Sequence, residues 1–592
     1  MAMSSDQRLQ ALGQLWMGKW PEALEAWSKF TKLTPPRLVT TPGEEKAERL
    51  SGSFAMIRLE DHAVVISLRQ VEELGLQSFA AQILAHEIGH HVYAPADLRD
   101  NALLIARIKA ALPTEGHEGF VANLYTDLLI NNRLQVSRSL DMAGVYKKLR
   151  REDDAGKVWG LYMRIYEYLW DLPEGTLTPP IKDKKILVDA QLGARVIKAY
   201  SKDWLDGAGR FAALLAPYME ERGFKKSMAV FGPILDADKA GGGGVIPDGL
   251  AEIDPGEAEG AIHPADDPDL SGFGDMDDGP EGGEKSSAPA AGGRAEIGGR
   301  KNNYRSPAEY TSLMKSAAAG VKEDELVVRY YRERALPHLI SFPERESPQA
   351  SDPLPEGLEI WDMGQPFGEL DWVETMVKSP VVIPGITTYQ RTYGYSEGSS
   401  PDRRPPDLYV GIDCSGSMVN PKHALSYPAL AGAIVAISAL RAGARVMACL
   451  SGEPGKYKET DGFLRDEKEV LKLLTGYLGT GYAYGIRRLQ DTFLGAGGVK
   501  TPAHIIVITD QDIFMMIKEA PNGWDVAFDA LKAARGGGTF VLNITNPSYY
   551  SREINKLEEA GWSVYLVNNQ EQMLEFARKF SQRTYSVETD GS

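Results

Sequence analysis

A long acidic stretch rich in glycine and proline interrupts this chain of 592 residues and prevents it from folding around one core. Between Asp236 and Glu284 there are fifteen Asp and Glu residues against a single Lys, and aromatic residues are nearly absent. Such a composition cannot bury enough apolar surface to offset the entropy of ordering the chain. The sequence therefore predicts that residues 236–300 form a disordered, solvated tether, or alternatively a regulatory segment that covers a basic surface or a cation site.

The tether separates parts of the chain that differ in pattern. Residues 1–235 are predicted to be mainly helical, with a strand-like region at Phe54–Leu68. Residues 404–592 alternate apolar strands with amphipathic helices. Residues 301–403 are less regular and contain one clear helical segment, Glu323–Leu336, followed by proline-rich, aromatic loops. A chain of this length is expected to hold more than one domain.

Composition excludes several classes of protein. The net charge of −17 argues against nucleic acid or an anionic membrane as a partner. Two cysteines are too few for a secreted disulfide scaffold. The first twenty residues lack the pattern of a signal peptide, and no apolar run is long enough to cross a bilayer. These features predict a cytoplasmic protein.

The segment QSFAAQILAHEIGHHVYAP is predicted to be a helix that ends before Pro95. Residues four apart lie on one face of a helix, so His86 and His90 can offer two imidazoles to one cation, as zinc prefers. Glu87 is placed to act as a general base on water beside that cation. His91 lies about 100° around the helix from His90 and is expected to face elsewhere.

A catalytic zinc site needs a third protein ligand. The best candidate is Asp127, in the predicted helix Gly119–Leu134, where Asn123, Asp127 and Asn131 form one polar stripe on an apolar background. A buried carboxylate is costly unless it is paired or binds a metal.

Two alternatives to Asp127 as the third ligand remain open on the residues alone. Asp127 can instead form an ion pair with Arg133 or Arg107, and His117 or Glu118 can supply the third ligand. The position of His117 and Glu118 at a loop-to-helix junction favours a capping role for both.

The motifs HEIGHH and NLYTDLLINNRL together resemble the zincin-type metallopeptidase domain of bacterial proteins that also carry a von Willebrand factor A-like domain. The resemblance is strong over residues 50–140. It implies that Asp127 completes a Zn²⁺ site with His86 and His90, with Asn123 and Asn131 in supporting roles. The aromatic residues of VWGLYMRIYEYLWDL are interpreted as core.

A second cation motif follows the apolar segment Asp407–Asp413, which is predicted to be a strand. Asp413, Ser415 and Ser417 form a D-x-S-x-S sequence directly after it. One carboxylate and two hydroxyls on a tight turn offer hard oxygen ligands, which suit Mg²⁺ or Mn²⁺. The next segment, His423–Arg441, is strongly apolar and is predicted to be a helix packed on a sheet.

Further strands are predicted at Arg445–Leu450, His504–Asp510, Thr539–Ile544 and Ser563–Val567. Their alternation with helices predicts an α/β fold with a doubly wound, open parallel sheet. Ligands of such sheets bind beyond the carboxyl ends of the strands, where Asp413 and Asp510 are expected to lie.

The region 404–582 resembles a von Willebrand factor A domain with a complete metal-ion-dependent adhesion site. The resemblance implies that Asp413, Ser415 and Ser417 form the first loop, Thr480 the second and Asp510 the third, around Mg²⁺ or alternatively Mn²⁺ or Ca²⁺. Gln511 departs from the glycine that many relatives have after the third-loop aspartate. In that family an acidic residue of a protein partner completes the coordination.

These features predict a zinc metallopeptidase, acting on a protein or peptide, that is fused to a Mg²⁺-dependent docking domain. Proteins of this layout are often associated with a MoxR-type AAA+ ATPase, so the resemblance implies such a partner. One alternative is a non-catalytic adaptor or chaperone subunit for that ATPase, with a structural or vestigial zinc site. A weaker alternative is a subunit resembling those of metal chelatases, against which the H-E-x-x-H helix counts.

Overall fold

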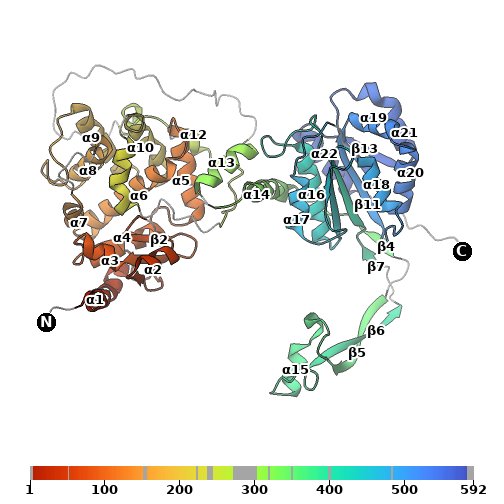
Figure 1. Ribbon diagram of the computed structural model, residues 1–592, viewed down its shortest axis with the longest axis horizontal. Coiled ribbons are helices and arrows are strands. Elements are labelled where there is room, and N and C mark those ends of the chain that lie inside the picture. Colours follow the sequence, from red (N-terminus) through yellow and green to blue (C-terminus); the bar gives the residue numbers. More distant parts are fainter. Residues whose placement is uncertain are drawn as a thin grey trace. The chain divides into compact units, whose positions relative to one another are not determined.

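The computed structural model describes residues 4–50, 52–150, 156–221, 224–235, 245–259, 261–270, 303–317, 320–347, 351–397, 402–481 and 485–582. The chain divides into two compact units, unit 1 from Met1 to Leu326 and unit 2 from Val327 to Ser592 (Figure 1). The division falls inside the segment 301–403, so the first residues of that segment belong to unit 1. Among the described helices, none is both long and apolar enough to cross a membrane.

Unit 1 is mainly helical, as the sequence predicts. Its helices are α1 (Ser5–Glu25), α2 (Pro42–Ala47), α3 (Leu68–Glu73), α4 (Ala80–Val92), α5 (Leu98–Ala111), α6 (Glu118–Arg138), α7 (Met142–Leu149), α8 (Lys157–Leu169), α9 (Lys184–Ala199), α10 (Trp204–Met219), α11 (Phe224–Phe231), α12 (Gly256–Glu259) and α13 (Pro307–Ala317). The 3-10 helices η1 (Gly232–Ile234), η2 (Pro264–Asp266) and η3 (Pro268–Leu270) also belong to it. Helix α14 (Glu323–Ala335) spans the division between the units.

The strand-like region predicted at Phe54–Leu68 forms an antiparallel pair, β2 (Ala55–Arg58) and β3 (Ala63–Ser67). A short strand not predicted from the sequence, β1 (Arg37–Val39), pairs in parallel with β3. Within the described residues the sheet order is β1-β3-β2, so β2 is an edge strand. Every residue of β2 and β3 is buried.

Helices α4 and α6 cross closely beside this sheet and carry the predicted metal ligands. Gly89 of α4 lies at the contact between the two helices, next to the predicted ligands His86 and His90. A Cβ atom at Gly89 would lie only 2.6 Å from Cγ2 of Ile130 on α6 and 2.6 Å from the ring of Trp27. The absence of a side chain at this position therefore lets α4 approach α6.

The prediction of disorder for residues 236–300 is wrong for residues 245–259 and 261–270, which fold onto unit 1. Leu250, Ala251 and Leu270 are buried there. The carboxylates of this stretch meet arginines that come from distant parts of the sequence. These ion pairs are Arg107–Asp254, Arg210–Asp267 and Arg305–Glu257. The remainder of the predicted tether lies outside the described residues.

Unit 2 contains the predicted α/β region. Its strands are β4 (Arg345–Ser347), β5 (Ser351–Ile360), β6 (Tyr389–Glu397), β7 (Asp402–Arg404), β8 (Asp407–Asp413), β9 (Val446–Ser451), β10 (Tyr457–Glu459), β11 (Ala503–Asp510), β12 (Arg535–Asn543) and β13 (Trp562–Leu566). Its helices are α15 (Trp372–Lys378), α16 (Tyr427–Arg441), α17 (Glu467–Leu474), α18 (Gly485–Phe493), α19 (Asp512–Glu519), α20 (Gly523–Ala534), α21 (Ser551–Glu559) and α22 (Gln570–Ser581), together with the 3-10 helices η4 (Leu336–His338), η5 (Phe367–Glu369) and η6 (Pro547–Tyr550).

The main sheet of unit 2 has the order β10-β9-β8-β11-β12-β13 among the described strands. Strands β9, β8, β11, β12 and β13 run in parallel, as predicted, but β10 is antiparallel to β9. The sheet is therefore mixed. The three-residue edge strand β10 is not among the predicted strands because it is exposed and lacks the apolar pattern that marks the buried ones. Helices α16, α17 and α22 cover one face, and α18, α20 and α21 cover the other (Figure 1).

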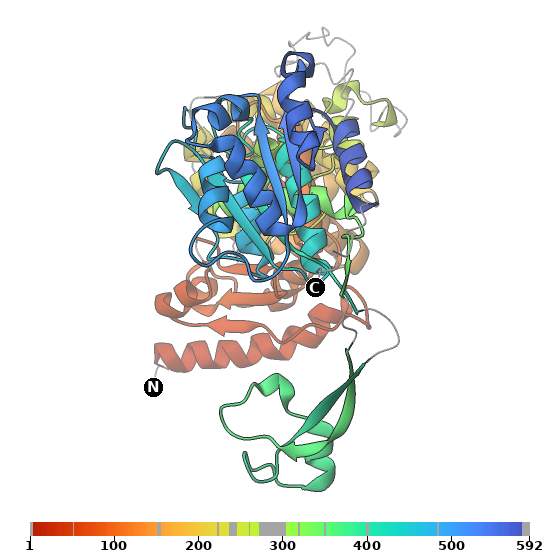
Figure 2. The same ribbon diagram turned by 90° about the vertical axis from the view of Figure 1, so that its right-hand side faces the viewer.

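The proline-rich segment before the sheet is not only loops. β5 and β6 form a long antiparallel hairpin, and α15 packs against β6 (Figure 2). Strands β4 and β7 pair on either side of this hairpin in the sequence. The prediction of loops after Glu323–Leu336 is thus wrong for β5 and β6. In β5, Pro353 and Pro355 obscure the strand pattern.

Candidate metal centres

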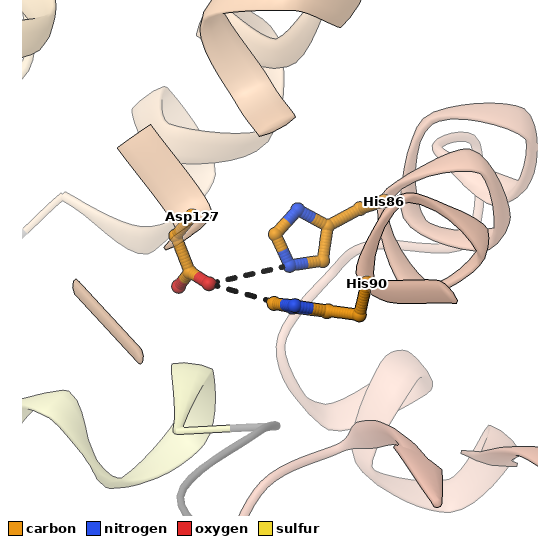
Figure 3. Close-up of side chains that lie close together, drawn as sticks. All are labelled: His86, His90 and Asp127. Carbon is orange, nitrogen blue, oxygen red and sulfur yellow. Dashed lines mark ion pairs between the residues drawn. The ribbon is translucent and has the colours of Figure 1, made fainter. Parts of the chain in front are cut away.

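His86, His90 and Asp127 lie together in unit 1, as the sequence predicts. The Nε2 atoms of His86 and His90 are 3.7 Å and 3.5 Å from Oδ1 of Asp127. The rings come from successive turns of α4 and the carboxylate from α6, and all three groups point toward one place (Figure 3). One ligand atom from each residue lies within 4.8 Å of the others, and all three residues are buried.

Each histidine has a hydrogen bond on the side of the ring that faces away from Asp127. Nδ1 of His90 donates to the backbone carbonyl of Ala94 at 3.1 Å, because a carbonyl oxygen can only accept. Nδ1 of His86 lies 2.6 Å from the side-chain oxygen of Asn131 and donates to it. In the neutral rings this leaves the lone pair of each Nε2 directed toward Asp127, which is the tautomer that metal binding requires.

Two tyrosines orient the Asn131 amide. Its nitrogen donates to the hydroxyls of Tyr146 at 3.0 Å and Tyr166 at 2.9 Å, so its oxygen is turned toward His86. Burial raises the pKa of both tyrosines well above the ordinary value of 10, and the charge of Asp127 contributes to the rise. Both hydroxyls therefore remain protonated at neutral pH.

Asp127 is oriented by the other asparagine of the predicted stripe. Asn123 donates to Oδ2 of Asp127 at 2.8 Å, while Oδ1 is the atom that faces the imidazoles. The arginines considered as partners for Asp127 are engaged elsewhere. Arg107 pairs with Asp206 and Asp254, and Arg133 lies over the rings of Tyr93 and Trp27.

The other candidates for a third ligand do not join this group. His117 occupies the N-cap position of α6 and packs edge-on against Phe224, and Glu118 accepts a hydrogen bond from the backbone of Gly116. His91 stacks at 3.9 Å on His62, as expected for a residue on another face of α4. Among the residues that the structure describes, His86, His90 and Asp127 are the cluster with the spacing of a metal site.

A small cavity of about 30 Å³ adjoins the cluster. Glu87, which is only 1% exposed, lines it together with His86 and Asp127. The remaining wall is almost wholly apolar and consists of Phe54, Ile83, Met142, Val145, Tyr146, Leu149 and Ile234, with Asn131 as the other polar member. A water molecule needs about 10–15 Å³ of such space, so the cavity can hold water beside the ligands.

The second predicted site forms at the carboxyl ends of β8 and β11. Asp413 accepts hydrogen bonds from the backbone N–H of Ser415 and from the hydroxyl of Thr509, both at 2.8 Å. The hydroxyls of Ser415 and Ser417 are 2.9 Å apart. Asp510 follows Thr509 on β11, the strand next to β8. The first and third predicted loops are thus adjacent.

Thr480 of the predicted second loop is joined to the first loop through the backbone. The N–H of Gly416 donates to the carbonyl of Thr480 at 2.7 Å, and the N–H of Glu453 donates to the Thr480 hydroxyl at 3.2 Å. Burial raises the pKa of Asp413, and the neighbouring charge of Asp510 adds to this rise. A bound cation would offset this repulsion between carboxylates.

Burial also raises the pKa of the Cys414 thiol to about 12, with a further contribution from the charge of Asp413. The thiol is therefore protonated and unreactive at neutral pH. This agrees with the interpretation of Cys414 as a small residue that fills space between the predicted ligands.

Several residues that support the two sites were not identified from the sequence. Tyr146 and Tyr166 hold Asn131, the Ala94 carbonyl fixes His90, and Thr509 holds Asp413. Tyr166 belongs to the aromatic helix interpreted as core, and it is buried in that core. Its spacing of four residues from Tyr162, to whose hydroxyl it is also bonded at 3.0 Å, was the available signal of a polar function.

A scan against models of protein families found no match for this chain, and a search of curated proteins also found none.

Proposed function

We propose that unit 1 is a zinc-dependent metallopeptidase of the zincin type. The observation that carries this proposal is the convergence of Nε2 of His86, Nε2 of His90 and a carboxylate oxygen of Asp127. Two imidazoles and one carboxylate are a common ligand set of catalytic zinc and leave a fourth position open. Zinc bound there would act as a Lewis acid and lower the pKa of a coordinated water molecule.

The residues of the chain have separate functions in this proposal. Asn131 and the Ala94 carbonyl keep the imidazoles in the tautomer that binds the metal, and Asn123 directs Asp127 toward them. Glu87, on the wall of the cavity, accepts the proton of the attacking water and delivers it to the leaving amine. The apolar wall around Glu87 excludes bulk water.

The test is a comparison of wild type with Glu87→Gln, in zinc content and in hydrolysis of an unfolded protein such as reduced casein. We expect both proteins to hold one zinc per chain, while hydrolysis falls at least about 100-fold in the variant because the general base is lost. Equal hydrolysis by both proteins would overturn the assignment as a peptidase.

We propose that unit 2 is a docking domain of the von Willebrand factor A type. Its Mg²⁺ would be held by Asp413, Ser415, Ser417, Thr480 and Asp510, and an acidic residue of a protein partner would complete the site. A AAA+ ATPase of the MoxR type is the proposed partner, and the peptidase unit would act on proteins that it delivers. The two cysteines are both buried free thiols, which accords with the reducing cytoplasm.

A magnesium titration tests the site in unit 2. Because a cation that binds only the folded state stabilises it, we expect millimolar Mg²⁺ to raise the melting temperature of wild type. Asp413→Ala should abolish this rise, whereas Asp461→Asn, a change at an exposed carboxylate away from the predicted loops, should preserve it. A rise of equal size in Asp413→Ala would contradict the assignment.

One observation favours a second candidate function, an adaptor or chaperone subunit that does not hydrolyse peptides. The cavity beside Glu87 is far too small for a polypeptide, so the site is closed in this structure. If Glu87→Gln leaves the cellular function of the protein intact while zinc is retained, the adaptor assignment is correct.

A further inference from the structure

A short segment of the chain itself closes the candidate zinc site. It consists of η1 and the following residue, Gly232–Leu235, and is called the strap below. Ile234 of the strap is 8% exposed and forms part of the cavity wall that also contains Glu87 and Asp127. The strap directly follows α11 and comes about a hundred residues after Asp127 in the sequence.

The backbone of the strap is bonded on one side to the edge of the sheet. The carbonyl of Pro233 accepts hydrogen bonds from the Ser53 hydroxyl at 3.0 Å and from the N–H of Phe54 at 3.4 Å. Ser53 and Phe54 lead directly into β2, the edge strand. The strap is a 3-10 turn, so it does not add a strand to the sheet and is bonded through the Pro233 carbonyl to the residues just before β2.

On its other side the strap is hydrogen-bonded to Asn123, the residue that orients Asp127. The carbonyl of Ile234 accepts from Nδ2 of Asn123 at 3.3 Å, and the same nitrogen donates to Asp127 at 2.8 Å. The carbonyl of Pro233 is thus bonded to the residues before β2. The next carbonyl, that of Ile234, is bonded to Asn123, which orients Asp127.

The side chain of Ile234 lies in an apolar environment next to the reactive groups. Phe54, Met142, Val145 and Leu149 line the cavity with it, and they come from the start of β2 and from α7. Among the described residues that line this cavity, Glu87 and Asp127 are the acidic ones, and there is no Lys or Arg. The wall therefore suits a bulky aliphatic side chain and disfavours a charged one.

We propose that the strap is an intramolecular occupant of the substrate groove. It blocks the site in the resting protein, and Ile234 marks a subsite for a bulky aliphatic residue of a peptide substrate. This inference rests on the proposed peptidase function, because it names the substrate class and the regulation of that site. Displacement of Gly232–Leu235 is the step that admits substrate.

Access to zinc gives a test that does not depend on hydrolysis. The rate at which the chelator 4-(2-pyridylazo)resorcinol removes zinc from the full-length protein reports how often the site opens. We expect Ile234→Ala, which removes the side chain from the cavity, to raise this rate at least about 10-fold. Ser53→Ala removes the hydroxyl bond to Pro233 together with the bonds between that hydroxyl and the backbone of Ala55, and it leaves the Ile234 side chain in place. It should raise the rate by a smaller factor.

Ile186→Ala is the matched control. Ile186 is a buried aliphatic residue on α9, 4% exposed, that does not line the cavity. Its truncation costs stability as Ile234→Ala does, but it should leave the rate of zinc removal within about 2-fold of wild type. Equal rates in Ile234→Ala, Ser53→Ala and wild type, or an equal increase in Ile186→Ala, would overturn the proposal.

Two peptides test the substrate class on the zinc-loaded Ile234→Ala protein. Acetyl-Gly-Pro-Ile-Leu-amide should restore slow zinc removal, because its isoleucine refills the subsite. Acetyl-Gly-Pro-Asp-Leu-amide should have no effect at the same concentration. Equal protection by both peptides would overturn the aliphatic subsite.

The two proposals fail in different ways. Strap variants that release zinc faster but hydrolyse no protein would support the strap and contradict the peptidase. Hydrolysis that is as fast in wild type as in Ile234→Ala, with unchanged zinc access, would support the peptidase and contradict the strap.

Discussion

At the scale of single residues, the groups behind each imidazole decide whether unit 1 can hold a metal. The Ala94 carbonyl permits one tautomer of His90, whereas the Asn131 amide permits either tautomer of His86, depending on its orientation. A flipped amide would donate to Nδ1 of His86 and leave the proton on Nε2, where it opposes metal binding. In the structure the oxygen of Asn131 faces His86. Metal binding and this orientation therefore favour each other.

The choice of the third ligand gives a prediction at this scale. Asp127→Asn preserves the shape of the side chain but removes its charge, so we expect zinc content to fall from one per chain to below about 0.1 after dialysis. Glu118→Gln, at the rival position, should retain the full zinc content because Glu118 bonds to the backbone of Gly116 and is not part of the cluster. Elemental analysis of both proteins measures the result, and zinc lost only from the Glu118 variant would show that the assignment is wrong.

At the scale of secondary structure elements, the distance between α4 and α6 sets the geometry of the group formed by His86, His90 and Asp127. The two histidines belong to α4 and the carboxylate to α6, so any displacement of one helix separates the ligands. Gly89 lies between His86 and His90 on α4 and faces Ile130. A glycine inside a helix is less favourable than an alanine by about 1 kcal/mol. Its presence at position 89 therefore indicates that close packing of the two helices outweighs helix propensity here.

We therefore expect Gly89→Ala to lower the free energy of unfolding of unit 1 by about 1–3 kcal/mol, because the new methyl group overpacks the contact with Ile130 and Trp27. Zinc affinity should fall together with stability. Gly18→Ala is the matched control, since Gly18 is in the exposed part of α1 with no atom within 4 Å of a new Cβ. It should raise stability by about 0.5–1 kcal/mol, as urea unfolding can measure. A stabilising effect of Gly89→Ala would contradict the close approach of the helices.

At the scale of the whole molecule, part of the negative charge that the sequence assigns to a solvated tether is paired with arginines in unit 1. Asp267 is buried between Arg210, at 2.5 Å, and the hydroxyl of Tyr200, at 2.7 Å. Desolvation tends to raise the pKa of Asp267, but the hydrogen bonds from Tyr200 and Arg210 outweigh it, so the pKa is below its ordinary value of 3.8. Part of the acidic stretch thus contributes to the stability of unit 1 when it is ionised.

This pKa shift predicts a pH-dependent effect of Asp267→Asn. The stabilisation by a carboxylate of lowered pKa is complete above the unfolded pKa of about 3.9 and is lost as pH falls through the folded pKa. We expect the variant to be less stable than wild type by about 1–3 kcal/mol at pH 7 and pH 5. The difference should shrink below pH 4. Urea unfolding at several pH values measures it, and a difference that persists unchanged at pH 2.5 would contradict this account.

The short-range features of this protein follow from the sequence alone. The spacing of His86 and His90 fixes both rings on one face of α4, because helix geometry repeats every 3.6 residues. Likewise the apolar segment before Asp413 forms a buried strand, and the D-x-S-x-S turn follows at its carboxyl end. These features depend on neighbours within a few residues, and the structure confirms the helix and the strand.

Tertiary structure decided the rest, because the deciding contacts join residues far apart in the sequence. The sequence alone does not distinguish Asp127 from His117 and Glu118 as the third member of the cluster. The contact between α4 and α6 places Asp127 beside His86 and His90. Arginines of α5 and α10, Arg305 and the burial of Leu250, Ala251 and Leu270 order part of a stretch whose composition predicts disorder. The position of Ile234 over the site likewise depends on β2 and Asn123. Composition and periodicity describe a segment in isolation, whereas burial and charge pairing depend on what the fold places beside it.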